Sequence, residues 1–344
     1  MDSTFIMIIL RITSGLGNQM FQYAFYTLLK KKYPDVEVQC DTFWFNSFHE
    51  HHGYELEKIF DNVTGSNFEI KKASVFQITK LSGMIPNFFS SNFCMTFEKI
   101  RRYPNRLLKN NLLKSRQPFI IDELEGNLSS KDIVLNDGSI ENELFNTLMK
   151  LDTKKDYYIK GFFISEKYYS QVIDEVKKKL VFPAFSEDYN LAYEKAMMES
   201  DSVSIHVRRG DYLSDLYKDK FITLGKEYYE NAVNYITNEI KKQCEKEGRN
   251  PNIKFFVFSD DADFVNREFD WLSDKTIVTE NTGDDSYKDM QLMSTCKHNI
   301  IANSTFSQWG ALLNRNEGAI TIYPKVYMVD QDNEMKKTPL WVRL

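Results

Sequence analysis

The sequence predicts an α/β protein whose second half forms a parallel, doubly wound sheet, and three observations lead to this fold class. Strand-like and helix-like patterns alternate regularly from about residue 190 onward. The chain opens with an apolar run that passes through a Gly-x-Gly turn into a helical pattern. Polar residues gather directly after several predicted strands, and ligands bind at such strand ends in open α/β sheets.

The first part of the chain begins regularly and then becomes irregular. Residues 5–12 predict a buried strand, and 18–33 predict a helix that ends before a proline. Residues 36–41 alternate like a second strand. We assign 43–150, which are rich in Phe, Asn and Lys and include helical stretches such as 97–113, to the irregular part of a first domain.

Regular alternation then follows to the end of the chain. Residues 156–163 predict a strand, and 165–180 a helix with Ser165 as its N-cap. Beyond them, the predicted strands cover 202–212, 252–261, 275–281, 298–306 and 318–324. The helices between these strands cover 225–243, 261–269, 286–296 and 306–314. This spacing is typical of a parallel sheet with helical crossovers.

Composition limits the function classes. The 344 residues carry a formal net charge of −5, which disfavours nucleic acid as the main partner. Residues 101–116 hold six basic side chains and no acidic one, which indicates either a solvated helix face or a patch for anionic lipid head groups. The four cysteines lie far apart, which suits a reducing cytosol, and no run is long enough to span a membrane. We therefore expect a cytoplasmic protein with at most peripheral membrane contact.

The opening turn resembles a dinucleotide-binding turn but lacks one of its requirements. That fingerprint needs three glycines, and here Gly15 and Gly17 fill two places while Met20 stands at the third. A side chain of this size would hold the helix away from the strand. The nicotinamide-dependent dehydrogenase is thus disfavoured, and Asn18 and Gln19 need another explanation.

Three predicted strand ends carry clustered polar groups, which predicts one ligand crevice. They are 206–211 (HVRRGD), 259–261 (SDD) and 303–306 (NSTF). The adjacent Arg208 and Arg209 suit a pyrophosphate, because the guanidinium fork keeps its charge and binds phosphate oxygens in pairs. The alternative is a surface pair between an arginine and Asp211, which stabilises little.

The other polar clusters each allow more than one interpretation. Asp261 and Asp263 could bind Mg²⁺ or Mn²⁺, cap a helix, or accept hydrogen bonds from a nucleoside. Residues 303–306 precede a helix and form either an anion site or an N-cap. The histidines around 49–52 lack the spacing of a metal site.

Taken together, the motifs resemble those of the bacterial α-1,2-fucosyltransferases of glycosyltransferase family 11. In chain order they read GLGNQMFQYA, HHGYELEKIF, YIKGFFISEKYY, HVRRGDY, FVFSDD and NSTFSQWGALLN. They cover nearly the whole chain, and the H-x-R-R-x-D motif is the most specific of them.

The resemblance implies a GT-B-like architecture, in which two Rossmann-like domains face a cleft. We place the N-terminal, acceptor-side domain at 1–155 and the GDP-fucose-binding domain at 156–344. The implied reaction is the inverting, metal-independent transfer of L-fucose from GDP-fucose to the 2-hydroxyl of a terminal β-galactoside. The acceptor would be a galactose-terminated oligosaccharide or a lipid-linked glycan, and no cofactor is expected.

The resemblance also implies roles for particular residues. The catalytic set is His206, Arg208, Arg209 and Asp211, with the arginines on the pyrophosphate. Asn18 would reach the donor from the N-terminal domain, Asp260 or Asp261 would contact the nucleoside, and Ser304 and Thr305 the phosphates. The complete donor-binding set is Gly15, Gly17, Asn18, Gln19, Ser259, Asp260, Asp261, Asn303, Ser304, Thr305 and Phe306.

Acceptor contacts and the proton acceptor are less defined. We expect His51, His52 and Tyr54 to contact the acceptor, although the chain has His-His-Gly where the family pattern has His-Asn-Gly. Thr305 and Gln308 also stand where Ser and Trp are frequent. Asp211, His206 or a β-phosphate oxygen would take the acceptor proton. The rival functions are a transferase for another nucleotide sugar and a glycan-binding module without catalysis.

Overall fold

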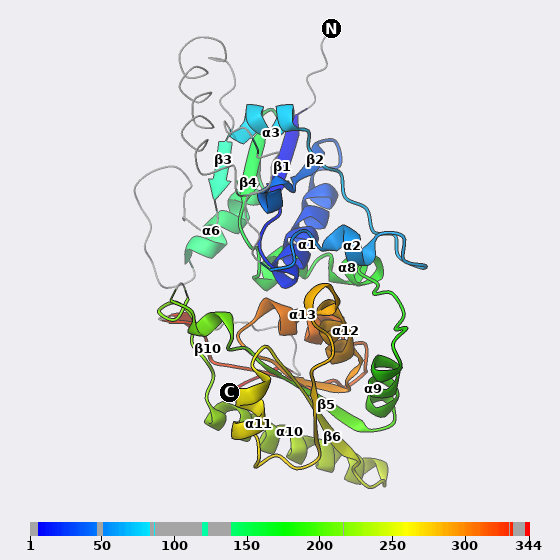
Figure 1. Ribbon diagram of the computed structural model, residues 1–344. Coiled ribbons are helices and arrows are strands. Elements are labelled where there is room, and N and C mark those ends of the chain that lie inside the picture. Colours follow the sequence, from blue (N-terminus) through cyan, green and yellow to red (C-terminus); the bar gives the residue numbers. More distant parts are fainter. Residues whose placement is uncertain are drawn as a thin grey trace. The chain divides into compact units, whose positions relative to one another are not determined.

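The computed structural model describes residues 6–46, 51–82, 86, 119–122, 139–215, 217–329, 331–332 and 341–344. The chain divides into two compact units, unit 1 (Met1–Pro183) and unit 2 (Ala184–Leu344). Each unit contains a parallel sheet accompanied by helices (Figure 1). The prediction of an α/β protein with two domains on parallel sheets is confirmed.

Unit 1 contains a parallel four-stranded sheet in the order β2-β1-β4-β3. Its strands are β1 (Met7–Arg11), β2 (Glu37–Asp41), β3 (Phe119–Asp122) and β4 (Tyr157–Lys160). In β1, Ile8, Ile9 and Leu10 are all buried, because this strand lies inside the sheet and is covered on both faces.

The principal helix of unit 1 is α1 (Leu16–Lys32), which follows β1 directly. Aromatic side chains fix it in place: Phe25 stacks on Phe163, with ring centroids 4.0 Å apart, and both rings are fully buried. The other helices of the described part of unit 1 are η1 (Phe43–Asn46), α2 (Leu56–Phe60), α3 (Val75–Ser82), α6 (Ser139–Leu148), α7 (Glu166–Tyr169) and α8 (Ile173–Lys179).

The domain boundary lies later in the chain than the predicted 155/156. Strand β4 pairs with both β1 and β3, so it belongs to the first sheet, and the units divide after Pro183. The helix predicted over 165–180 is interrupted and forms α7 and α8. Ser165 is the N-cap residue of α7, but its side chain makes no capping hydrogen bond. The helical stretch 97–113 and the basic stretch 101–116 lie outside the described residues.

Unit 2 contains a parallel six-stranded sheet in the order β12-β9-β8-β5-β6-β7. The strands are β5 (Asp201–Val207), β6 (Ile253–Ser259), β7 (Lys275–Val278), β8 (His298–Ile300), β9 (Thr321–Tyr323) and β12 (Trp341–Arg343). A separate antiparallel pair joins β10 (Val326–Met328) to β11 (Gln331–Asp332).

Helices cover both faces of this sheet, as in a doubly wound fold. They are α9 (Asp188–Met198), α10 (Lys226–Glu247), α11 (Ala262–Glu268), α12 (Tyr287–Thr295) and α13 (Thr305–Leu313), with the short 3₁₀ helices η3 (Asp211–Leu213) and η4 (Gly283–Asp285). On one face, Val203 and Val257 pack in a core with residues of α10 and α11. On the other, Phe256 and Phe258 pack with residues of α9 and α12. Alternate strand residues thus fill two separate cores.

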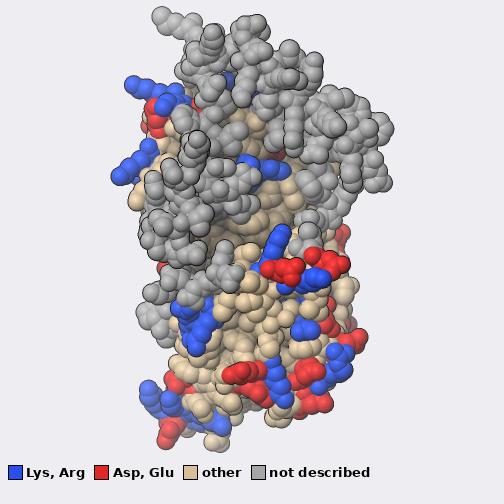
Figure 2. Space-filling model, turned by 90° about the vertical axis from the view of Figure 1, so that its left-hand side faces the viewer, with Lys and Arg blue, Asp and Glu red and all other residues tan. Residues whose placement is uncertain are grey.

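Charged side chains of both signs are interspersed over the visible face of unit 2 (Figure 2). This mixed surface agrees with the modest net charge of −5. In the ranges that the structure covers, no helix combines the length and the apolar character needed to cross a bilayer.

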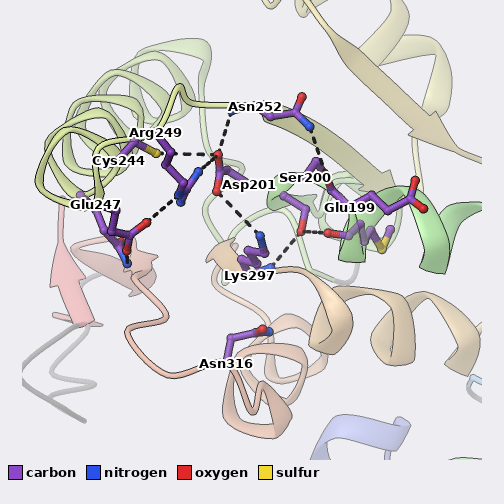
Figure 3. A network of polar contacts seen from close by, with 12 residues as sticks. Glu199, Ser200, Asp201, Cys244, Glu247, Arg249, Asn252, Lys297 and Asn316 are labelled. Carbon is purple, nitrogen blue, oxygen red and sulfur yellow. Dashed lines mark hydrogen bonds and ion pairs between the residues drawn. The ribbon is translucent and has the colours of Figure 1, made fainter.

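A buried carboxylate anchors the start of β5, at the opposite end of the strand from the polar motif. The side chain of Asp201 is 3% exposed and accepts hydrogen bonds from Arg249 Nη1 and from the backbone N–H of Asn252, both at 2.8 Å (Figure 3). Lys297 Nζ lies 3.8 Å from Asp201 Oδ1. Burial alone raises the pKa of Asp201, but the bonds from Arg249 and Asn252 outweigh it and lower the pKa below its usual value.

We expect Asp201→Asn to lower the free energy of unfolding by about 1–3 kcal/mol, because the buried hydrogen bonds from Arg249 and Asn252 would end on a neutral amide oxygen and no longer on a carboxylate. The folded pKa lies below the unfolded one, so the stabilisation is present above the unfolded pKa and disappears as pH falls through the folded pKa. Urea unfolding of both proteins at a series of pH values measures this. Glu239→Gln, in an exposed pair on α10, is the control and should change stability little.

Candidate functional site

The carboxyl ends of β5 and β6 bring two of the predicted motifs together. The two strands pair in parallel, and His206 and Val207 align with Phe258 and Ser259. The loop after β5 therefore lies beside the loop after β6. This register places the arginines of the first motif next to the aspartates of the second.

Asp260 connects these two loops. Its Oδ1 accepts a hydrogen bond from the backbone N–H of Arg209 at 2.8 Å, and its Oδ2 lies 3.1 Å from Arg208 Nη1. A Cβ at Gly210 would lie 3.0 Å from the same Oδ2. Glycine at this position thus allows the carboxylate to approach the loop backbone closely.

Arg208 is held by two carboxylates. Besides Asp260, Asp211 accepts a hydrogen bond from Arg208 Nη2 at 2.7 Å, and the ring of Tyr212 lies 5.8 Å from its Cζ. Burial alone lowers the pKa of Arg208, but the two carboxylates outweigh it and raise the pKa. The guanidinium therefore keeps its charge although its side chain is only 24% exposed.

Arg209 is held differently, by one carboxylate and one aromatic ring. Its Nε lies 3.4 Å from Asp261 Oδ2, and its Cζ lies 3.7 Å from the centroid of the Phe264 ring. Asp261 also caps α11, because its Oδ1 accepts a hydrogen bond from the Phe264 backbone N–H at 2.9 Å. Ser259 Oγ in turn accepts a bond from the backbone N–H of Asp261 at 3.0 Å.

His206 lies on β5, and its ring centroid is 5.9 Å from that of Phe306. Burial, and secondarily the charge of Arg208, lowers the pKa of His206 to about 3. The imidazole is thus neutral near pH 7. Its buried Nδ1 has no hydrogen-bond partner within the described part of the chain.

The predicted site residues just before α13 also make structural hydrogen bonds. Ser304 is the N-cap of α13, and its Oγ accepts from the Phe306 N–H at 3.3 Å. The side chain of Asn303 is buried and donates to the carbonyls of Ile222 and Tyr327 at 2.9 and 2.8 Å. The backbone of Thr305 forms a hydrogen bond with the Tyr327 hydroxyl.

In unit 1, the turn between β1 and α1 forms a second polar cluster. Ser14 adopts a left-handed φ of 68°, and its Oγ accepts a hydrogen bond from Asn18 Nδ2 at 3.0 Å. A Cβ at Gly15, the N-cap of α1, would lie 3.3 Å from the ring of His51. His51 itself has a left-handed φ of 58°. Three of the predicted residues, Gly15, Asn18 and His51, therefore lie around one turn.

Gln19 joins this turn to the segment that carries His51. Its Nε2 donates to the carbonyls of Ser14 and Gly53 at 2.8 Å, and its Oε1 accepts from the Glu55 N–H at 2.9 Å. The side chain is fully buried. Its carboxamide thus joins the backbone of the β1–α1 turn to the backbone at Gly53 and Glu55.

The remaining predicted residues of unit 1 are placed as follows. Gly17 is buried in the first turn of α1, and His52 is exposed. The centroid of the Tyr54 ring lies 5.6 Å from that of Phe45 and 5.3 Å from Lys72 Nζ. His49 lies outside the described residues.

Sequence reasoning missed Phe264, Tyr212 and Tyr327 as parts of the site. Phe264 follows Asp261 by three residues at the start of a predicted helix, so helical spacing was a signal for their proximity. Tyr212 is adjacent to the arginine motif, whereas Tyr327 reaches Thr305 only through the tertiary fold. Within the ranges that the structure covers, no three His, Cys, Asp or Glu side chains gather in a way that could hold a metal ion.

We expect Gln19→Leu to destabilise the protein by about 1–3 kcal/mol, because the buried Glu55 N–H and two carbonyls lose their partner. Thermal and urea unfolding measure the effect. Gln243→Leu, which removes an exposed amide on α10, is the matched control. Equal stability of the two variants would contradict the connecting role of Gln19.

Comparison with known proteins agrees with the motifs. The family model for glycosyl transferase family 11 matches residues 6–344. The O-antigen biosynthesis glycosyltransferase WbnK of Escherichia coli is 27% identical, over 97% of this chain and 99% of that protein. An alpha-1,2-colitosyltransferase of Escherichia coli is 28% identical, over 98% of each chain. The crystal structure of the fucosyltransferase NodZ from Bradyrhizobium has 12% identity and a TM-score of 0.48, over 90% of this chain and 94% of that one. With the family model matched along nearly its full length, the chain belongs to glycosyl transferase family 11.

Proposed function

We propose that the protein transfers L-fucose from GDP-fucose to the 2-hydroxyl of a terminal β-galactoside, with inversion and without a metal ion. The observation that carries this proposal is the Arg208–Arg209 pair, which three carboxylates hold at adjacent strand ends. Membership of the family supports the reaction class. The linkage is supported by the relative that is an alpha-1,2-colitosyltransferase.

The arginine pair suits the departure of a nucleoside diphosphate. Negative charge grows on the leaving diphosphate as its bond to the sugar breaks. Guanidinium groups that are already oriented stabilise this charge without reorganising during the reaction. Asp260 and Asp261 already hold the arginines, so in this proposal they position the cations instead of contacting the nucleoside.

The acceptor hydroxyl must lose a proton during transfer. His206 is a weak base, because its pKa is lowered to about 3. Asp211 is engaged by Arg208 at 2.7 Å. We therefore favour a β-phosphate oxygen of the leaving group as the proton acceptor, and we assign acceptor contacts to His51, His52 and Tyr54.

A second candidate is the transfer of colitose, because one relative is a colitosyltransferase. The acceptor in either case would be a galactose-terminated oligosaccharide or a lipid-linked glycan. A panel of GDP-linked sugars that includes both fucose and colitose separates the two donors.

The first test incubates the purified protein with each GDP-linked sugar, excess EDTA and a panel of galactosides. We expect GDP release only when an acceptor is present, together with a product heavier by one deoxyhexose. Product mapping should place the new bond on the galactose 2-hydroxyl. Activity abolished by EDTA and restored by Mn²⁺ would contradict the metal-free mechanism, and sugar binding without GDP binding would indicate a glycan-binding module.

We expect Arg208→Ala and Arg209→Ala each to lower turnover by roughly 10²–10³-fold, as loss of a transition-state charge partner does in other enzymes. Arg267→Ala, which removes an exposed arginine on α11 outside the β5 loop, is the control and should retain normal turnover. Circular dichroism checks that the variants fold. Near-normal transfer by a folded variant that lacks both arginines would overturn the assignment.

A further inference from the structure

Phe264 covers one face of the Arg209 guanidinium. The Cζ of Arg209 lies 3.7 Å from the centroid of the ring, which is stacking distance. The ring itself is supported from behind, because Phe264 packs against the apolar core that α10 and α11 share with the sheet. Phe269 of that core lies 6.4 Å from it, centroid to centroid.

One carboxylate ties the ring and the guanidinium together. Asp261 Oδ2 lies 3.4 Å from Arg209 Nε, while its Oδ1 caps the backbone N–H of Phe264 at 2.9 Å. The cap fixes the first turn of α11, and with it the ring, relative to the same carboxylate. The contacts of the guanidinium are therefore made through one face and through the Nε edge.

The two arginines thus differ in what they present. Arg208 pairs through Nη1 with Asp260 and through Nη2 with Asp211. A ligand at Arg208 must therefore compete with these two carboxylates for the terminal nitrogens. Arg209 is held through its face and its Nε. Its two terminal nitrogens match the fork that binds two phosphate oxygens at once.

We propose that Phe264 is a positioning residue that holds the Arg209 fork in the orientation that binds the diphosphate of the donor. This inference rests on the proposed function. An apolar side chain of similar volume would fill the space but would lose the attraction between the ring face and the cation. In this proposal Phe264 acts on diphosphate affinity through Arg209.

The test compares Phe264→Leu with Phe264→Tyr, using titration calorimetry with GDP and with inorganic pyrophosphate. We expect Phe264→Leu to raise the Kd for both probes roughly 3- to 10-fold, and Phe264→Tyr to stay near the wild-type value. Trp271→Leu is the matched control, because Trp271 packs against the same core. It should lower thermal stability without changing either Kd.

A double-mutant cycle separates positioning from general destabilisation. In the Arg209→Ala background, Phe264→Leu should cause no further loss of affinity, because the residue it positions is gone. An unchanged Kd for Phe264→Leu, or losses that multiply in the double variant, would overturn the proposal.

A ligand-free measurement keeps this test separate from the proposed function. Ring current should shift the NMR signal of the Arg209 Nε proton in the wild type and in Phe264→Tyr, and the shift should disappear in Phe264→Leu. The same shift in Phe264→Leu would overturn the positioning role. A wild-type protein that shows the shift and binds pyrophosphate, but does not bind GDP, would contradict the proposed donor while it supports the role of Phe264.

Discussion

The carboxylate of Asp260 determines the geometry of the candidate site in unit 2. One oxygen accepts from the backbone of the β5 loop and the other faces the Arg208 guanidinium, so a single side chain aligns both arginines. This contact requires the parallel pairing of β5 and β6, which places the two loops side by side. It also requires Gly210, since a Cβ there would lie 3.0 Å from the carboxylate. The positions of the two arginines therefore depend on the strand pairing, on Gly210 and on Asp260 together.

Position relative to the end of β5 explains why His206 and Arg208 differ in charge. Val203, Ile205 and Val207 face the core shared with α10 and α11. His206, one position before Val207, faces the opposite side and lies near Phe306. A histidine buried there loses its charge, whereas Arg208 lies beyond the strand and keeps its charge beside two carboxylates. Burial within the strand thus makes the imidazole neutral, whereas the carboxylates beyond the end of the strand keep the guanidinium charged.

Much of the fold and part of the site follow from the sequence alone. Short apolar strands, helical periodicity and polar strand ends are local signals, and they correctly predict parallel sheets and the meeting of 206–211 with 259–261. The boundary near 155 was wrong, because the partners of β4 lie far away in sequence. The sequence also did not predict that the side chains of Gln19 and Asn303 bind backbone carbonyls. A polar side chain in a motif has the same sequence signature whether it binds backbone or ligand. The roles of Gln19 and Asn303 depend on tertiary packing.

The charged cluster of unit 2 contains two guanidinium groups and three carboxylates, and its imidazole is neutral. Its formal charge is therefore one negative unit, although it holds two adjacent arginines. Under the proposed function, this cluster would not attract a phosphate at long range, and binding would depend on the oriented N–H groups at contact distance. Dissolved salt screens the distant repulsion more than the short contacts. The rate of encounter with this cluster should consequently be insensitive to moderate ionic strength or rise with it, the opposite of electrostatic steering by a basic groove.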